Sequence, residues 1–278
     1  MQAAEAGPVS LHNSFRRSNR SVDFGLHSSR NYARTGQGLA EPAISILDHL
    51  LKRHPELFRD LEDLVWKALE IAPAIRMTYL DWQWGELAGQ VAPRTPVKLA
   101  LLVLERLERD ESPHISSDPL IQALMKATEV DPAGVWEVVG KALLRTDRYG
   151  YRLLLSLGRG YGELIPAETL VRWARENQPR GPLIAAQLVV ISAPLPERAR
   201  KLIAEFPDND DILHVFAAGL HSGGFVGPIS ANLEGLLATV RQWEEDLDQR
   251  IKAWARRLAS DIKNEVKEMK LIEEGEEL

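Results

Sequence analysis

Apolar residues along most of this chain recur at spacings of three and four positions, the period that places them on one face of an α-helix. The pattern begins near Glu41 and continues with few pauses. The segment 56–72 is typical, because its charged residues occupy the face opposite its apolar ones. That apolar face is formed by Leu57, Leu61, Leu64, Val65 and Ala68. Runs of alternating apolar and polar residues are nearly absent, so the pattern predicts an all-α fold.

Prolines mark the expected helix starts, because the first turn of a helix tolerates both their fixed φ and their missing N–H. The prolines that stand just before an apolar-periodic stretch are Pro42, Pro55, Pro96, Pro119, Pro132, Pro166, Pro179, Pro196 and Pro228. Thr95, Asp118 and Asp131 directly precede three of them, and we expect their side chains to cap the helices that follow.

The expected helices, roughly a dozen of about 11 to 20 residues, are compatible with a bundle, a globin-like cluster or a stack of helix pairs. The segment 118–145 contains two helices with a turn at residues 130–132, and comparable pairs recur at about 35 to 45 residues. That period is typical of helical solenoids. We therefore predict an α-solenoid of stacked antiparallel helix pairs over residues 41–278.

Residues 1–40 differ from the rest of the chain, because they lack apolar periodicity and are rich in Ser, Arg, Asn and Gly. Their basic residues are Arg16, Arg17, Arg20, Arg30 and Arg34, against the acidic Glu5 and Asp23. We predict a disordered or extended basic arm. Its Arg16, Arg17 and Arg20 are the candidates for contacting nucleic acid.

The composition limits the classes of function. Apolar residues make up 45% of the 278 residues, enough for a substantial core, and the net charge of -6 offers no general attraction for nucleic acid or anionic lipid. The absence of cysteine excludes disulfides, thiolate nucleophiles and zinc sites built on sulfur. No apolar run approaches the roughly 18 to 20 residues of a membrane span, and the N-terminus lacks the pattern of a secretory signal. We expect a cytoplasmic protein without membrane contact.

The glycine-rich segment 158–162 includes Arg159 and is a candidate phosphate-binding loop, because backbone N–H groups of such loops bind anions. A dinucleotide loop follows a strand, whereas the preceding Leu153, Leu154 and Leu155 look helical. We therefore expect a turn between repeats and keep Arg159 as a candidate binding residue.

Metal and catalytic patterns are missing from the sequence. None of the seven histidines belongs to a recognised metal spacing, and His214 and His221 stand two helical turns apart, too far for one ion. The acidic segment 208–211 lacks the later residues of a calcium loop, so we expect it to cap a helix. No Ser/His/Asp or paired-carboxylate arrangement can be singled out. We predict no catalytic, cofactor-binding or metal-binding residue, and no enzyme activity.

The tryptophans fall into two groups. On apolar stripes, and therefore expected in the core, are Trp66, Trp136, Trp173 and Trp254. Trp82 and Trp84 lie two positions apart, about 200° around a helix, and cannot both face the same core. One of them is a candidate anchor for a partner, since tryptophan is enriched at interface hot spots. The alternative is burial between two flanking helices.

The segment Asp246–Ala255, DLDQRIKAWA, resembles the second-helix signature of HEAT repeats, in which an acidic pair caps the helix. Its apolar stripe continues through Ile251, Trp254, Leu258, Ile262, Val266 and Met269. We predict a closing helix from Leu247 to Met269. The acidic tail 273–277 is interpreted as a polar cap on the last repeat.

The longer block 196–268, with SGGFVGPIS at residues 222–230, resembles the C-terminal sensor arms of bacterial STAND and NACHT-type signalling ATPases and related antiphage proteins. No G-x-x-x-x-G-K-[ST] phosphate loop occurs in the chain, so the ATPase itself is missing from it. The resemblance implies a HEAT-like module with a C-terminal capping block over about 196–278.

These observations favour a non-catalytic scaffold or sensor module that binds another protein, and the resemblance adds a context of bacterial defence or signalling. The alternative is a nucleic-acid-associated assembly factor that uses the basic N-terminal arm. An enzyme of unrecognised type is the third hypothesis. Turnover of nucleotide that depends on Arg159 would favour it.

Overall fold

The computed structural model describes residues 40–71, 78–109, 119–221 and 228–276. Within these ranges all regular secondary structure is helical, which confirms the predicted all-α class. The helices are α2 (Ala40–Arg53), η1 (Pro55–Leu57), α3 (Phe58–Ile71), α4 (Thr78–Val91), α5 (Pro96–Arg109), α6 (Pro119–Val130), α7 (Pro132–Leu143), α8 (Arg148–Leu157), η3 (Tyr161–Leu164), α9 (Ala167–Glu176), α10 (Arg180–Leu188), α11 (Glu197–Glu205), α12 (Asp210–His221), α13 (Ile229–Trp243) and α14 (Gln249–Glu276). None of these helices is both long enough and apolar enough to cross a bilayer.

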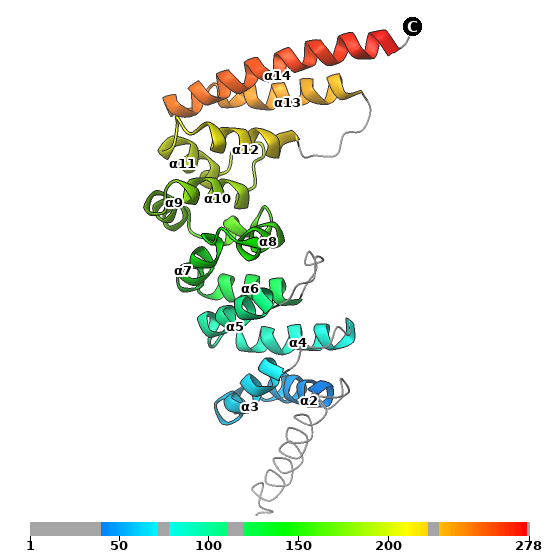
Figure 1. Ribbon diagram of the computed structural model, residues 1–278, viewed down its shortest axis with the longest axis vertical. Coiled ribbons are helices and arrows are strands. Elements are labelled where there is room, and N and C mark those ends of the chain that lie inside the picture. Colours follow the sequence, from blue (N-terminus) through cyan, green and yellow to red (C-terminus); the bar gives the residue numbers. More distant parts are fainter. Residues whose placement is uncertain (1–39, 72–77, 110–118, 222–227, 277–278) are drawn as a thin grey trace, which may run out of the picture.

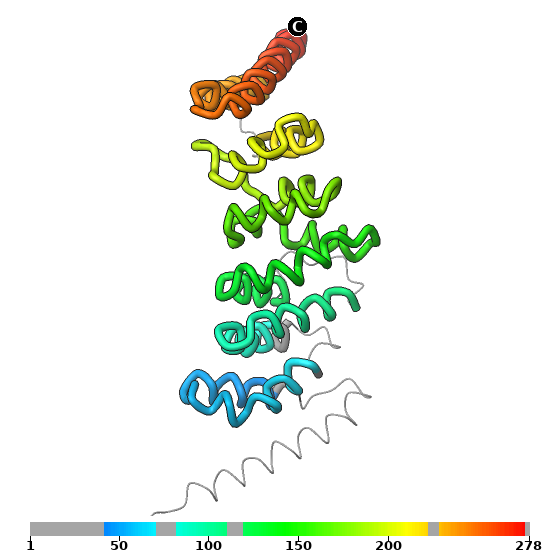
Figure 2. The backbone as a smooth tube through the Cα atoms, turned by 90° about the vertical axis from the view of Figure 1, so that its left-hand side faces the viewer, coloured from blue at the N-terminus to red at the C-terminus, as the bar shows by residue number. Residues whose placement is uncertain are grey.

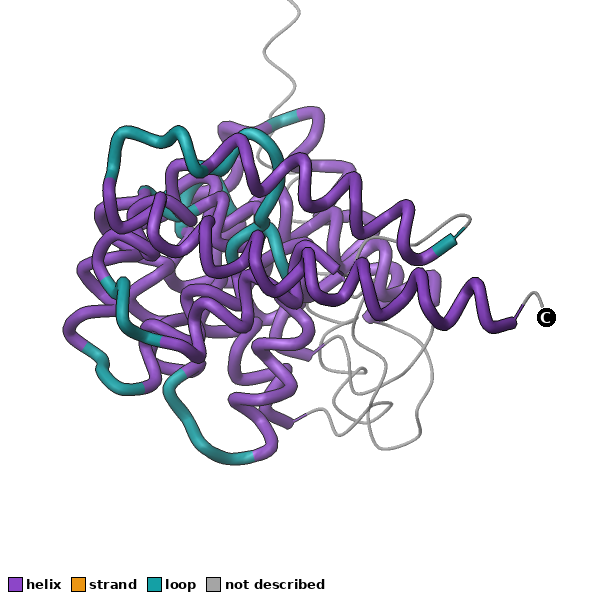
Figure 3. Tube along the Cα trace, turned by 90° about the horizontal axis from the view of Figure 1, so that it is seen from above, coloured by secondary structure: helices purple, strands orange, loops and turns teal. Residues whose placement is uncertain are grey.

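The helices form an elongated stack. Figures 1 and 2 show them following one another along the long axis, from α2 and α3 at one end to α13 and α14 at the other. In one row α2 packs against α4 and α4 against α6, and in the other α5 packs against α7 and α9 against α11. Figure 3, viewed along the stack, shows the end of α14 reaching beyond the layers below it. Buried apolar side chains form one continuous core through these layers.

The predicted helix starts are confirmed. η1, α5, α6 and α7 begin at a proline, and α9, α10, α11 and α13 begin one residue after one. Pro42 lies in the first turn of α2. Each position accommodates the fixed φ of proline and needs no N–H donor.

The predicted caps are confirmed only in part. Asp131 accepts a hydrogen bond from the N–H of Gly134 at 2.9 Å and caps α7. The prediction for Thr95 was wrong, because its hydroxyl is buried beside α5 without a hydrogen-bond partner among the described residues. Asp118 lies outside the described residues. Asp147, which the sequence pattern did not single out, caps α8 by accepting from the N–H of Gly150 at 3.0 Å.

An arginine ladder links successive layers. Four guanidinium groups donate to carbonyl oxygens at or just after the C-terminal end of a helix in the preceding layer, where the helix itself supplies no N–H partner. The pairs are Arg106 with Leu69, Arg152 with Leu107, Arg180 with Leu144 and Arg198 with Ile165. The partners are 33 to 45 residues apart in the sequence. Each of these four arginines thus ties its own helix to the preceding layer by a charge-assisted hydrogen bond.

Most of the tryptophans expected in the core are buried. Trp66, Trp136 and Trp254 are almost fully enclosed. Trp173 is partly buried and packs edge-on against Trp136, with ring centroids 4.8 Å apart. Trp254 stacks on Trp243 of α13 at 5.6 Å and meets Phe216 of α12 at 6.3 Å. These aromatic contacts join the last three helices.

The closing helix is longer than predicted. α14 runs from Gln249 to Glu276, so part of the expected acidic tail is helical, and Leu247 lies before the helix with 93% of its surface exposed. The reason is that the carboxylate of Glu273 accepts hydrogen bonds from the N–H and hydroxyl of Ser230, at the first turn of α13. Hydrogen bonds from the Ser230 hydroxyl and N–H also lower the pKa of Glu273. The last turns of α14 therefore cap its neighbour.

Candidate protein-binding surface

The structure distinguishes the two neighbouring tryptophans of α4. Trp84 is buried: its indole N–H donates to the carbonyl oxygen of Leu69 at 3.1 Å, and the guanidinium of Arg106 lies 5.4 Å from its ring. Burial lowers the pKa of Arg106 to about 10, so this group stays charged at neutral pH. Trp82 has 56% of its surface exposed. The two side chains therefore face different surroundings, as their spacing predicted, and Trp82 is the exposed one.

A second exposed apolar group lies on α8. Tyr151 and Leu155 have 64% and 63% of their surfaces exposed, and they stand four positions apart on one stripe of the helix. Arg148 continues this stripe at the first residue of α8, and Arg159, two residues beyond the end of the helix, is also exposed. We call Arg148, Tyr151, Leu155 and Arg159 the α8 ridge.

The opposite side of α8 is held firmly by the preceding layers. Leu153 and Leu157 are buried in the core. The hydroxyl of Tyr149 donates to the carbonyl oxygen of Leu104 at 3.0 Å, and Arg152 donates to that of Leu107 at 2.7 Å. Burial raises the pKa of Tyr149 to about 12, so this donor keeps its proton at neutral pH. The α8 ridge therefore lies on the exposed face of a helix whose opposite face is packed in the core and hydrogen-bonded to α5.

The charge around the α8 ridge is positive. The acidic residues that flank α8 in the sequence are both engaged by arginines: Asp147 by Arg145 at 2.5 Å and Glu163 by Arg198 at 2.9 Å. Hydrogen bonds from the N–H of Gly150 and from the side chain of Arg145 lower the pKa of Asp147. The carboxylate of Asp147 therefore stays ionised beside Arg145. Arg148 and Arg159, in contrast, form no ion pair with any acid in the described part of the chain. The ridge thus offers two uncompensated cations beside two apolar side chains.

The glycine-rich segment after α8 is a turn between helices, as predicted, and its N–H groups are already used. Gly158 and Gly160 have positive φ values of 61° and 107°, which glycine adopts without strain. The N–H of Gly158 donates to Leu154, and that of Gly160 donates to Leu188 at 2.9 Å. These two donors therefore do not point into a phosphate site. Arg159 instead extends across to Gly219 of α12, where any larger residue would collide with its guanidinium.

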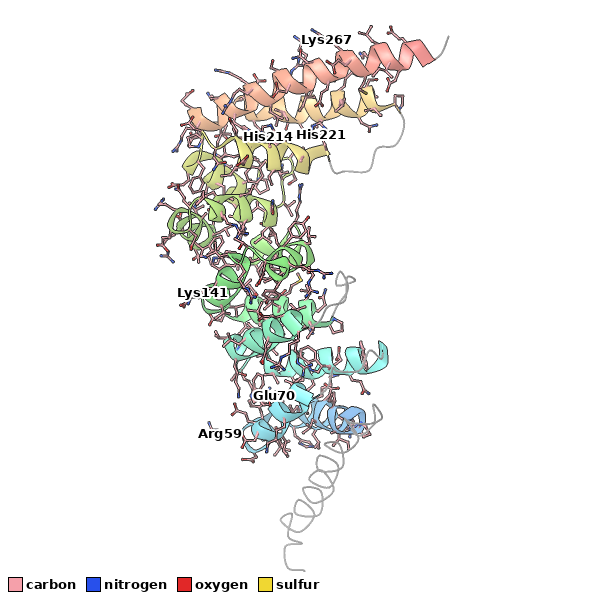
Figure 4. The ribbon with its side chains drawn as sticks, viewed as in Figure 1. Arg59, Glu70, Lys141, His214, His221 and Lys267 are labelled. Carbon is pink, nitrogen blue, oxygen red and sulfur yellow. The ribbon has the colours of Figure 1, made fainter. Side chains whose placement is uncertain are left out.

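The remaining polar candidates have structural roles. The side chain of Asn209 accepts from the N–H of Ile212 at 3.1 Å, so the acidic segment 208–211 caps α12 as predicted. Together with Glu205, this segment borders an open depression of about 520 Å³. His214 contacts the carbonyl oxygen of Asp210, and His221 lies 4.0 Å from Glu265. Figure 4 shows both histidines along α12. Across the described ranges no three potential ligands gather around a metal site.

Some predicted residues are not brought together, and others were missed. Arg16, Arg17 and Arg20 lie outside the described residues. Trp82 on α4 and Arg159 after α8 belong to different layers, with α5, α6 and α7 between them in the chain. Tyr151 and Leu155 were missed, although α8 carries apolar residues on opposite faces, an arrangement that leaves one apolar face uncovered unless another element packs on it.

A comparison of the chain with protein-family models, with curated proteins and with solved structures gives no match. The resemblance of the C-terminal block to STAND and NACHT-associated repeats therefore stays a prediction.

Proposed function

We propose that this chain is a non-catalytic protein-binding scaffold or sensor module, and that the α8 ridge is where its protein partner docks. The observation that carries the proposal is the exposure of Tyr151 and Leu155, at 64% and 63%, between two arginines that pair with no described acid. Aromatic residues and arginine are enriched among the few residues that dominate protein interfaces.

The energetics favour a protein over a small polar ligand at this position. Burying a large apolar side chain stabilises a complex by about 1.5–3 kcal/mol, so Tyr151 and Leu155 together offer a useful anchor. Arg148 and Arg159 would attract acidic residues of the partner and speed its association. The partner expected here is an acidic protein segment that carries apolar side chains of its own.

Trp82 is a second candidate anchor for the same partner. It lies on α4, two layers before α8 in the stack, and is 56% exposed. A partner that contacted both Trp82 and the α8 ridge would span more than one layer, as is usual for helical-repeat proteins. The assignment to bacterial defence or signalling, and the HEAT-like description of the repeats, belong to the proposal and rest on the resemblance of residues 196–268.

The experiment begins with a photo-reactive amino acid in place of Tyr151, and with the same amino acid in place of Leu101 as a control. Leu101 is on α5, also apolar and 51% exposed. Cross-linking in native lysate identifies the partner by mass spectrometry. A partner captured from position 151 and not from position 101 is the expected result.

Direct binding of the purified partner then decides the proposal. The variant Y151A/L155A should bind at least about 30-fold more weakly, which corresponds to about 2 kcal/mol. The variant L101A should bind like the parent. Equal binding by Y151A/L155A, with an unchanged circular dichroism spectrum, would show that the α8 ridge is not the docking site.

A further inference from the structure

A row of cations lies along the final helix, apart from the α8 ridge. Lys252, Arg256, Lys263 and Lys267 follow one stripe of α14 and span about 22 Å of its length. Arg256, Lys263 and Lys267 are exposed, and Lys252 is half-buried. None of the four forms an ion pair with an acid among the described residues. We call these four residues the α14 row.

The direction of the α14 row follows from the contacts of α14 with α12. Trp254 and Glu265 meet Phe216 and His221 of α12. Lys263 and Lys267 each stand two residues from Glu265, about 200° around the helix. The row therefore faces away from α12, out of the end of the stack. Figure 4 shows Lys267 on the side of α14 opposite the two histidines of α12.

The arrangement of charge in the α14 row differs from that of four ion pairs on other helices of this protein. In each of those pairs a cation has an acidic partner four positions away on the same helix. The pairs are Lys52 with Asp48, Arg109 with Glu105, Lys141 with Glu137 and Lys201 with Glu197. In the α14 row the residues four positions apart are both basic, Lys252 with Arg256 and Lys263 with Lys267. Like charges at this spacing destabilise a helix, so the row is expected to serve an anionic partner.

We infer that the α14 row binds the phosphate backbone of a nucleic acid, independently of base sequence. The other two residues of the stripe, Gln249 and Ser260, are hydrogen-bonding residues that also contact phosphate. No large apolar side chain lies in the stripe from 249 to 267, so it lacks the anchor that protein interfaces use. Because the net charge of the chain is -6, the protein as a whole does not attract a polyanion, and any attraction has to come from a local group of cations. The α14 row is such a group.

The test is fluorescence anisotropy with the full chain and a labelled DNA duplex of about 20 base pairs, at several salt concentrations. Four phosphate contacts predict that log K falls with log salt with a slope of about -3.6, a loss of roughly 100-fold between about 50 and 200 mM. The variant R256Q/K263Q/K267Q should reduce the magnitude of this slope by about 2.7. Its thermal stability should be unchanged or higher, because both like-charge pairs are removed.

The matched control is R59Q/K67Q/R172Q, which removes three exposed cations of α3 and α9 that also pair with no described acid. It should retain the slope of the parent. Undetectable binding by the parent, an equal loss in the control, or full binding by the α14 variant would each overturn the inference. A poly-glutamate peptide could compete with the DNA equally well and lose its own binding in the α14 variant. That result would assign the α14 row to acidic proteins instead of nucleic acid. The α8 ridge is intact in both variants, so these outcomes do not bear on the proposed docking site.

Discussion

Arg152 of α8 donates a hydrogen bond, 2.7 Å long, to the carbonyl oxygen of Leu107, which lies 45 residues earlier in the last turn of α5. This bond satisfies a carbonyl that α5 leaves without an intrahelical partner, and it fixes the helix that displays Tyr151 and Leu155. One side chain thus connects the stability of the stack to the candidate binding surface.

Replacing Arg152 should therefore destabilise the fold. The variant Arg152→Met keeps the apolar stem of the side chain but loses the charged donor, and we expect a loss of about 1.5–3 kcal/mol in the free energy of unfolding by urea. Arg148→Met, on the exposed face of the same helix, is the control and should stay within about 0.5 kcal/mol of the parent. Similar values for the two variants would contradict a structural role for the arginine ladder.

The neighbouring tryptophans of α4 should differ sharply on truncation. Trp84→Ala removes a buried aromatic ring and the donor to Leu69, and should cost about 3–5 kcal/mol. Trp82→Ala changes a side chain that is 56% exposed and should cost less than about 1 kcal/mol. Urea unfolding followed by circular dichroism measures both. A large loss of unfolding free energy for Trp82→Ala would mean that this ring stabilises the fold and is not an anchor for binding.

Truncation of Trp254 tests the last layer. The ring lies between Trp243 and Phe216, so Trp254→Ala should cost about 3–5 kcal/mol. Because each layer of a stack depends mainly on its neighbours, limited proteolysis should cut residues 223–278 early while residues 55–195 persist. Leu247→Ala, at a position 93% exposed, should be cleaved like the parent. Loss of the whole chain in one step would contradict layer-by-layer stability.

Acidification should loosen the start of α14. Hydrogen bonds from the side chain and then the backbone N–H of Arg250 lower the pKa of Asp248 to about 2, from an ordinary value of 3.8. The folded pKa is the lower one, so this contribution to stability is present above about pH 4 and is lost as the pH falls toward 2. NMR of the Asp248 carboxyl and the Arg250 amide follows both changes. The variant Arg250→Gln should move the Asp248 midpoint back toward 3.8, and an unchanged midpoint would rule out this pairing.

The sequence by itself determined the helices. Period, proline position and short-range capping are local properties, so the starts of α5, α6 and α7 could be read from their prolines. The burial of Trp66, Trp136 and Trp254 followed from the same stripes. Local patterns failed where a distant group intervened: the end of α14 was misjudged, because Ser230 of another helix hydrogen-bonds to Glu273.

Only the tertiary structure decided which surfaces remain open. The spacing of Trp82 and Trp84 required them to face different ways, but the carbonyl of Leu69 and the guanidinium of Arg106, from other helices, determine that Trp84 is the buried one. The arginine ladder joins residues 33 to 45 positions apart, and the α8 ridge exists because no described helix covers that stripe. Helical periodicity specifies which residues share a face. Whether that face is buried depends on which helices the chain later packs against it, and a local pattern does not contain that information.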